Sequence, residues 1–126
     1  MLEKLQLMSM AQALAGHSSA RLQLIAGNIA NADTPGYRAR DLSEFAQEYD
    51  GSAGLILSHR RAAHLQSAPQ TEAEVFAAGG TIGPNGNGVS VDLELAKGVQ
   101  AREAHNMALS VYQAASAIIR ASLGRR

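Results

Sequence analysis

The first part of the chain carries apolar and small side chains at the spacing of a helix. Between residues 5 and 29 they recur every three or four positions, which places them on one face. This spacing predicts a helix over 5–29 that is ~36 Å long at 1.5 Å per residue. The stripe consists of Leu7, Ala11, Leu14, Ser18, Leu22, Ile25 and Ile29.

The C-terminal part repeats this pattern and adds a second apolar face. One stripe consists of Ala101, Ala104, Ala108, Val111, Ala115, Ile118 and Ser122. A second set lies largely on another face and consists of Leu95, Val99, Leu109, Ile119 and Leu123. Two apolar faces on one helix indicate more than one neighbour. The positions that we expect to carry helix packing are Leu7, Leu14, Leu22 and Ile25 in the first helix and Ala104, Ala108, Val111, Ala115 and Ile118 in the second.

The middle of the chain, residues 31–90, has no such periodicity. Residues 41–50 predict a short acidic helix, and the apolar run 55–57 is typical of a short strand. Residues 77–88 are rich in glycine and asparagine, a turn composition. Apolar side chains alternate with other residues over 89–95, which predicts a brief strand or an extended lead-in.

These elements predict a mainly α fold with two long terminal helices that pack as an antiparallel coiled-coil-like pair. We expect one domain, divided into an N-terminal assembly helix (1–30), a turn and small irregular insert (31–90), and a lead-in with a C-terminal assembly helix (91–126). Two helices with several apolar faces leave surface uncovered. We therefore expect further copies or related chains to cover it.

Composition narrows the class of partner. Eleven basic and eleven acidic residues cancel, aromatic residues are few, and cysteine is absent. Zero net charge argues against nucleic acid as a partner. No stretch approaches the roughly 18 apolar residues of a spanning helix. Lys4 and the sequence Ala13-Leu14-Ala15 resemble a secretory signal, but Glu3 and the polar residues of the segment argue against a cleaved one.

Candidate catalytic and metal-binding groups do not form a convincing constellation. The histidines are His17, His59, His64 and His105, and their spacing does not match a zinc site. We expect His17 and His105 to lie on helix surfaces or at helix contacts. The acidic pairs Glu44/Glu48 and Glu72/Glu74 are better explained as solvated faces than as acid–base dyads. We predict no enzyme activity, no metal and no cofactor.

Two further segments invite a binding interpretation. The sequence GPNGNG at 83–88 resembles a phosphate loop, but it lacks the following Lys-Ser/Thr and is better explained as a turn cluster. Arg60, Arg61 and His64 form a small basic patch, for which an acidic protein neighbour or the start of a surface helix is a better explanation than nucleic acid.

The segment NIANADTPGYR, residues 28–38, ends the first helix. Pro35-Gly36 fits the central positions of a type II turn, and Thr34 is disfavoured in helical geometry because it precedes proline. Asn31 is suited to the left-handed conformation that closes a helix. Asn28 is not explained by the turn. A buried asparagine can set the register between helices, and an exposed amide is the alternative.

The longer segment AGNIANADTPGYRARDL, residues 26–42, resembles the signature of bacterial flagellar rod and hook axial proteins. The matching residues are Asn28, Ile29, Ala30, Asn31, Thr34, Pro35, Gly36 and Tyr37. The ARDL that follows Tyr37, the segment 86–103 and the short length are similar to the proximal basal-body rod proteins. The basic segment 58–65 resembles their middle part more loosely.

This resemblance implies a structural role as a component of the proximal rod. Such a protein is exported unfolded, without a cleaved signal peptide, and assembles in the periplasmic part of the basal body. The partners implied are copies of itself, other flagellar rod proteins, the basal-body membrane ring and export-gate components. Asn28 and Asn31 would then set register between subunits. The alternatives are a sibling proximal rod protein, a cytoplasmic helical adaptor or chaperone-like module, and a small metalloenzyme.

Overall fold

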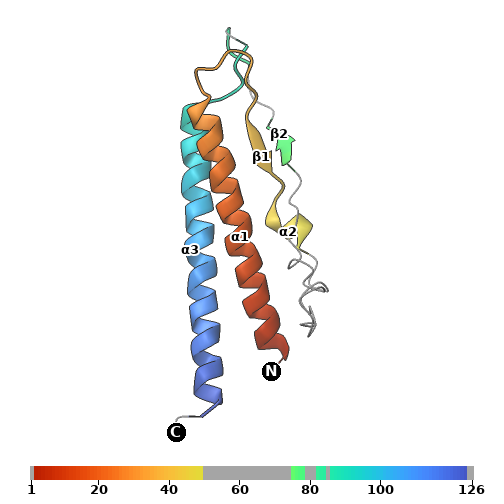
Figure 1. Ribbon diagram of the computed structural model, residues 1–126, viewed down its shortest axis with the longest axis vertical. Coiled ribbons are helices and arrows are strands. Elements are labelled where there is room, and N and C mark those ends of the chain that lie inside the picture. The colour runs from red at the N-terminus through yellow and green to blue at the C-terminus, as the bar shows by residue number, and fades with distance from the viewer. Residues whose placement is uncertain (1, 50–74, 79–81, 85, 125–126) are drawn as a thin grey trace, which may run out of the picture.

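Two long helices lie side by side and antiparallel in the computed structural model (Figure 1). The structure describes residues 2–49, 75–78, 82–84 and 86–124. The predicted mainly α fold, with a small insert between two long terminal helices, is confirmed. The elements in chain order are α1 (Leu2–Ala30), β1 (Arg40–Leu42), α2 (Phe45–Glu48), β2 (Val75–Ala77) and α3 (Val91–Ser122). We call the end where α1 stops and α3 begins the loop end, and the opposite end the open end.

Small side chains form the buried seam between α1 and α3. Apart from Asn28, the buried residues of the two helices recur every seven positions: Ala11, Ser18 and Ile25 on α1, and Glu94, Ala101, Ala108 and Ala115 on α3. Side chains this small allow the two backbones to approach closely. A Cβ atom added to Gly98 would lie 3.7 Å from Cγ2 of Ile25, which is ordinary van der Waals contact. The His105 ring also reaches across the pair, with Nδ1 3.1 Å from the carbonyl oxygen of Ala15.

The packing loosens towards the open end. Figure 1 shows the helices closest at the loop end and spread apart where α1 begins and α3 ends. Leu7 belongs to the predicted stripe, yet it is 40% exposed, and Ile118 on α3 is 52% exposed. Ala11 and Ala115, nearer the middle of the pair, are 3% exposed. The stripe read from the sequence is therefore only partly covered within one chain.

The insert contains short strands, as expected, but they form a two-stranded sheet at positions where the sequence predicted none. β1 and β2 pair antiparallel, with Arg40 opposite Ala77 and Leu42 opposite Val75. The predicted helix over 41–50 is wrong in its first part, because Asp41 and Leu42 are extended in β1 and only Phe45–Glu48 is helical. The side chains of Asp41 and Leu42 are buried, so tertiary contacts override local propensity there. The strand predicted at 55–57 lies outside the described residues.

The strand or extended lead-in predicted over 89–95 is wrong from Val91 onward, because α3 begins there. Ser90 occupies the N-cap position with an extended backbone, and Asp92 and Glu94 lie in the first turn, where acidic side chains favour a helix start. Val91, Leu93 and Leu95 are 40, 62 and 55% exposed, so their alternation does not mark a buried strand face. In the part of the chain that the structure describes, neither helix is long and apolar enough to cross a membrane.

Candidate assembly site

The turn after α1 has the predicted geometry. The backbone N–H of Tyr37 donates to the carbonyl of Thr34 at 3.2 Å, which places Pro35 and Gly36 at the centre of the turn. Gly36 has a φ of +75°, the positive value that a type II turn requires at its third position. A Cβ atom at Gly36 would meet nothing within 4 Å, so glycine is needed there for backbone conformation and not for space.

Asn31 closes the helix by a different route from the one predicted. No non-glycine residue in the described ranges has a positive φ, so the left-handed conformation expected for Asn31 is wrong. The Asn31 side chain instead donates from Nδ2 to the carbonyl of Gly27 at 2.8 Å, and its backbone N–H bonds the carbonyls of Gly27 and Asn28 at 3.2 Å. The side-chain amide thus adds a second donor to the Gly27 carbonyl at the end of the helix, where backbone donors run out.

Asn28 is the most buried large side chain among the described residues, with 0% exposure. Its Nδ2 donates to the carbonyl of Arg40 at 2.7 Å and to Oε2 of Glu94 at 2.8 Å. Its Oδ1 accepts from the backbone N–H of Arg40 at 2.9 Å and from the Tyr37 hydroxyl at 3.5 Å. Burial excludes the exposed-amide alternative. The bonds of this amide join α1, β1 and α3.

The bonds from Asn28 to both backbone groups of Arg40 imitate a neighbouring strand. Towards Arg40 the amide presents one N–H donor and its oxygen acceptor, as a peptide group does, and it binds the edge of β1 that faces away from β2. An unpaired strand edge is a site for unwanted pairing, and a covering group removes it. Asn28 therefore fixes where β1 lies along α1.

Four charged side chains continue the network next to Asn28. Arg21 binds Asp41 with both ends of its guanidinium, Nε to Oδ1 at 2.8 Å and Nη2 to Oδ2 at 3.1 Å. Lys97 Nζ lies 3.3 Å from Oδ2 of Asp41 and 2.9 Å from Oε1 of Glu94. Two cations and two carboxylates cancel. Because Asp41 is 5% and Glu94 2% exposed, the loss of one partner would leave a buried charge uncompensated.

The pKa values follow this pairing. Burial by itself would raise the pKa of Asp41, but the hydrogen bonds from Arg21 and from the Leu42 N–H outweigh it, and the pKa lies below its usual value. Burial likewise opposes the charge on Lys97, yet its bonds to Glu94 and Asp41 raise its pKa. The hydrogen bond to Asp41 raises the pKa of Arg21. All three groups are therefore held in their charged forms.

A third asparagine, Asn87, joins the two loops at this end. Asn87, in the predicted turn cluster, donates from Nδ2 to the carbonyl of Ala32, and its Oδ1 accepts the backbone N–H of Val89 at 2.9 Å. The backbone N–H of Gly88 donates to the carbonyl of Tyr37 at 3.0 Å. The turn cluster is therefore used to bind the loop that follows α1.

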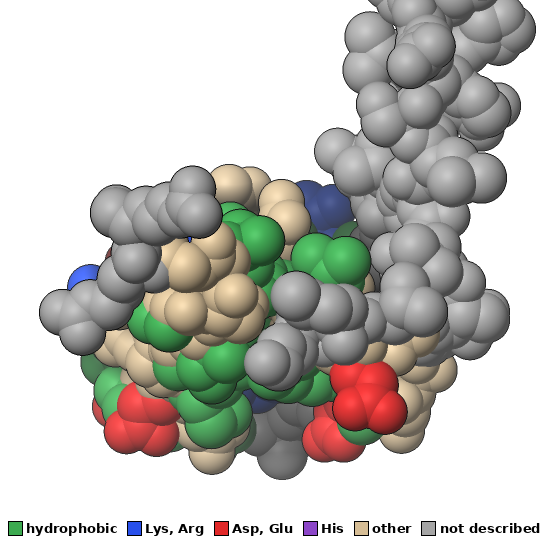
Figure 2. All heavy atoms as spheres, turned by 90° about the horizontal axis from the view of Figure 1, so that it is seen from below, with side chains coloured by type: hydrophobic (Ala, Val, Ile, Leu, Met, Phe, Trp, Pro, Cys, Tyr) green, Lys and Arg blue, Asp and Glu red, His purple; other side chains and the backbone are tan. Residues whose placement is uncertain are grey.

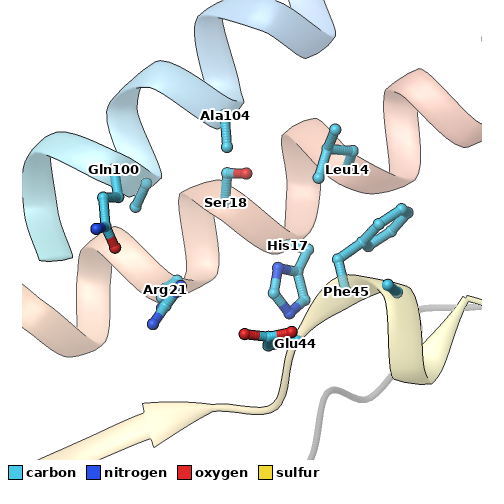
Figure 3. Close-up of a pocket in the computed structure, with 10 residues that line it drawn as sticks. Leu14, His17, Ser18, Arg21, Glu44, Phe45, Gln100 and Ala104 are labelled. Atoms are coloured by element: carbon cyan, nitrogen blue, oxygen red, sulfur yellow. The ribbon is translucent and has the colours of Figure 1, made fainter.

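The segment after β1 packs against the side of α1. The His17 ring meets Phe45 edge-on at 5.6 Å between centroids, and its Nε2 lies 2.9 Å from the Ser43 carbonyl oxygen. These side chains line a groove of about 310 Å³ that Gln100 and Ala104 of α3 also line. Figure 3 shows how the residues around it lie. His17 and His105 thus lie at contacts, as predicted. Among the described residues, no three His, Asp or Glu side chains lie close enough to hold a metal ion.

The residues predicted for helix packing and for the motif differ in how far they are buried. Ile25, Ala108 and Ala115 are buried, and Leu14, Leu22, Ala104 and Val111 are half-buried. Leu7 and Ile118 are exposed. In the motif, Asn28 is buried, Ile29, Asn31 and Tyr37 are half-buried, and Ala30, Thr34, Pro35 and Gly36 are exposed. The basic patch at Arg60, Arg61 and His64 and the pair Glu72/Glu74 lie outside the described residues.

Sequence reasoning missed the charged half of the network: Arg21, Asp41, Glu94 and Lys97. One signal was present. Glu94 lies seven residues before Ala101 and fourteen before Ala108, so it occupies a seam position where an acidic side chain needs a partner. No local pattern identifies Asp41 or Arg21 as that network's other members, since 20 residues separate them and only the fold brings them together.

Comparison with known proteins agrees with the resemblance. Residues 17–38 match the family described as "Flagella basal body rod protein". The chain is 36% identical over 85 residues to the flagellar basal body rod protein FlgB of Proteus mirabilis strain HI4320, and equally so to the FlgB of Proteus mirabilis. The first match covers 59% of this chain and 61% of the relative. The chain therefore matches about three fifths of the length of these relatives. The resemblance to flagellar basal-body rod proteins is confirmed.

Proposed function

We propose that this protein is a structural component of the proximal rod of the flagellar basal body. In this role it polymerises with other rod proteins into the hollow shaft that links the membrane ring and export gate to the distal rod. It is exported without a cleaved signal peptide and takes its place in the periplasmic part of the basal body. No catalytic step and no cofactor belong to this function.

The observation that carries the proposal is the position of the matched segment. Residues 17–38 include Arg21 and Asn28, two members of the buried network, and the turn at Pro35-Gly36. The similarity to rod proteins therefore falls on the part of the chain that holds α1, β1 and α3 in register. The role predicted for Asn28 and Asn31 in register between subunits remains a proposal. Within this chain the same side chains set the position of the helices from which subunit contacts are built.

The exposed apolar side chains also support assembly. Eight large apolar residues of α3, and Leu123 at its C-cap, have at least two fifths of their surface exposed: Val91, Leu93, Leu95, Val99, Met107, Leu109, Tyr112, Ile118 and Leu123. Large contiguous apolar surfaces mark sites of association. A helical shaft is built from head-to-tail contacts between unlike surfaces, which do not close into a ring.

The experiment is deletion of the gene in its own host, followed by complementation with a tagged copy. We expect the deletion to abolish swimming, the tagged chain to restore it, and the tag to copurify with detergent-extracted basal bodies. A cytoplasmic adaptor would support swimming without remaining in the purified basal bodies. A strain that swims normally after the deletion would contradict both interpretations. A sibling rod protein is distinguished by which rod segments remain when the chain is absent.

A further inference from the structure

The turn cluster before α3 contains two asparagines that are each followed by glycine, Asn85-Gly86 and Asn87-Gly88. In such a pair the backbone nitrogen of the glycine can attack Cγ of the asparagine, because glycine has no Cβ atom to hinder the approach. The second pair lies within the described residues. Asn87 therefore carries a chemically labile sequence at a place where its contacts are defined.

The reaction is the hydrolysis of the side-chain amide through an imide. The glycine nitrogen loses its proton to base and forms a bond to Cγ, which closes a five-membered ring. The bond from Cγ to Nδ2 breaks, and the side-chain nitrogen takes up a proton and leaves as ammonia. Water then opens the ring at either carbonyl and gives aspartate or isoaspartate. One water is consumed, one ammonia is released, and nothing is oxidised or reduced.

In the folded chain the attacking nitrogen is bound to the loop that follows α1. The N–H of Gly88 donates to the carbonyl of Tyr37 at 3.0 Å. Figure 1 shows the two loops together at the loop end. The proton that must leave before the attack is therefore held by an acceptor, and it becomes available to base only when this contact opens.

The side chain under attack is also bound on both sides. Nδ2 of Asn87 donates to the carbonyl of Ala32, and Oδ1 accepts the backbone N–H of Val89 at 2.9 Å. The bond from Val89 by itself would favour the attack, because it draws electrons away from Cγ. It has no effect while the Gly88 nitrogen keeps its proton, since the nucleophile is then absent.

The protection depends on these bonds and not on apolar cover. Asn87 and Gly88 are only half-buried, so water reaches their surroundings. Figure 2 views the molecule from the open end and shows hydrophobic side chains gathered there, at the opposite end of the helix pair from Asn87. The loss of the loop contacts is therefore sufficient to expose the site.

We infer that Asn87-Gly88 is a deamidation site that the folded loop end protects and the unfolded chain exposes. Because ammonia is lost, the change is not reversed on refolding, and its extent records the time that the chain has spent unfolded. In the product a carboxylate oxygen replaces the Nδ2 donor opposite the Ala32 carbonyl, so two acceptors face each other. The deamidated chain therefore closes its loop end less well. The inference does not depend on the rod role.

The test uses the full chain with Asn85→Ser, which leaves Asn87 as the one asparagine that precedes a glycine. Circular dichroism checks that this chain folds. It is incubated at mildly alkaline pH, either folded in buffer or unfolded in guanidinium chloride. Aspartate and isoaspartate at position 87 are then measured by mass spectrometry of proteolytic peptides. We expect deamidation to be at least about tenfold faster in the unfolded chain, because folding suppresses reactions that require opening.

Gly88→Ala in the same chain is the control for the chemistry. An added Cβ atom at Gly88 would lie 3.9 Å from the carbonyl oxygen of Tyr37, which is ordinary contact, so the N–H can keep its bond in the folded chain. The methyl group hinders the attack on Cγ. We expect the unfolded variant to deamidate several times more slowly than the unfolded Asn85→Ser chain.

Asn87→Asp reproduces the aspartate product and tests its effect on the fold. Asn106→Asp makes the same change of charge at an exposed position of α3 and is its control. We expect the melting temperature of Asn87→Asp to lie below that of Asn106→Asp by about 3 °C or more.

Three outcomes would overturn the inference. Equal rates in the folded and the unfolded chain mean that the loop end does not protect Asn87. An unchanged rate in unfolded Gly88→Ala means that the nitrogen of Gly88 is not the nucleophile. Equal melting temperatures of Asn87→Asp and Asn106→Asp mean that deamidation does not weaken the closure of the loop end.

Discussion

At the loop end of the helix pair Asn28, Asp41 and Glu94 are each at most 5% exposed, whereas at the open end Leu7 and Ile118 are 40 and 52% exposed. The loop end is polar, and each of these three side chains has partners within the chain. The open end is apolar and incompletely covered. Hydrogen bonds and ion pairs depend on direction and distance, so they define one arrangement of α1, β1 and α3. Apolar contact depends mainly on area, so it leaves the open end suited to association with other chains.

The substitution with the largest expected effect on stability acts directly on the loop end. Asn28→Ala removes the amide and leaves Glu94 and the backbone groups of Arg40 without their partner in a buried site. Unsatisfied buried groups cost about 1–3 kcal/mol each, so we expect a loss of about 3 kcal/mol in the free energy of unfolding. Urea denaturation measures it. Asn106→Ala, at an exposed position of α3, is the control and should change stability by less than about 0.5 kcal/mol. Equal stability of the two variants would contradict the role of Asn28.

The substitution with the next largest expected effect on stability tests whether the seam between α1 and α3 depends on small side chains. Ala108 is 1% exposed, and Ala108→Leu should force α1 and α3 apart. Overpacking costs about 1–3 kcal/mol, and we expect about 2 kcal/mol by thermal denaturation. We also expect the variant to block rod assembly, so that the strain loses motility. Ala117→Leu places the same side chain at an exposed position of α3 and should be close to neutral. A motile Ala108→Leu strain would refute this prediction.

Two glycine substitutions should have opposite signs. Gly36→Ala forces alanine into a φ of +75° and should destabilise the chain by about 1 kcal/mol, because the conformation is strained although space is available. Gly16 lies within α1 with nothing within 4 Å of an added Cβ atom, so Gly16→Ala should stabilise the chain by about 0.5–1 kcal/mol. Melting temperatures of the two variants give the comparison. A Gly36→Ala variant that is as stable as the wild-type chain, or more stable, would mean that the turn does not require glycine.

The smallest effect is a pH dependence at the loop end. The pKa of Asp41 is lowered in the folded chain, so its contribution to stability is present above the ordinary value of 3.8 and is lost as the pH falls through the folded value. The raised pKa of Lys97 acts in the other direction: its contribution is present below 10.5 and is lost as the pH rises through the folded value. Asp41→Asn should therefore lose less stability than the wild-type chain between neutral and acid pH, measured by urea denaturation. An identical loss would exclude Asp41 as the source.

The sequence by itself determined the two helices, the turn and the resemblance to rod proteins. These features are local: helix periodicity, Pro35-Gly36 and the asparagine motif lie within short stretches where neighbouring residues restrict the backbone. Of the residues in the predicted stripes, Ile25, Ala108 and Ala115 are buried.

Only the tertiary structure decided the rest. The same alternating pattern at Val91, Leu93 and Leu95 fits a strand or an exposed helix face, and the acidic helix start selected the helix. Asp41 and Glu94 became network members because α1 and α3 bring Arg21 and Lys97 beside them, a juxtaposition that depends on contacts distant in sequence. Burial of a charge is favourable only where the fold supplies its partner, and that information is not contained in any local pattern.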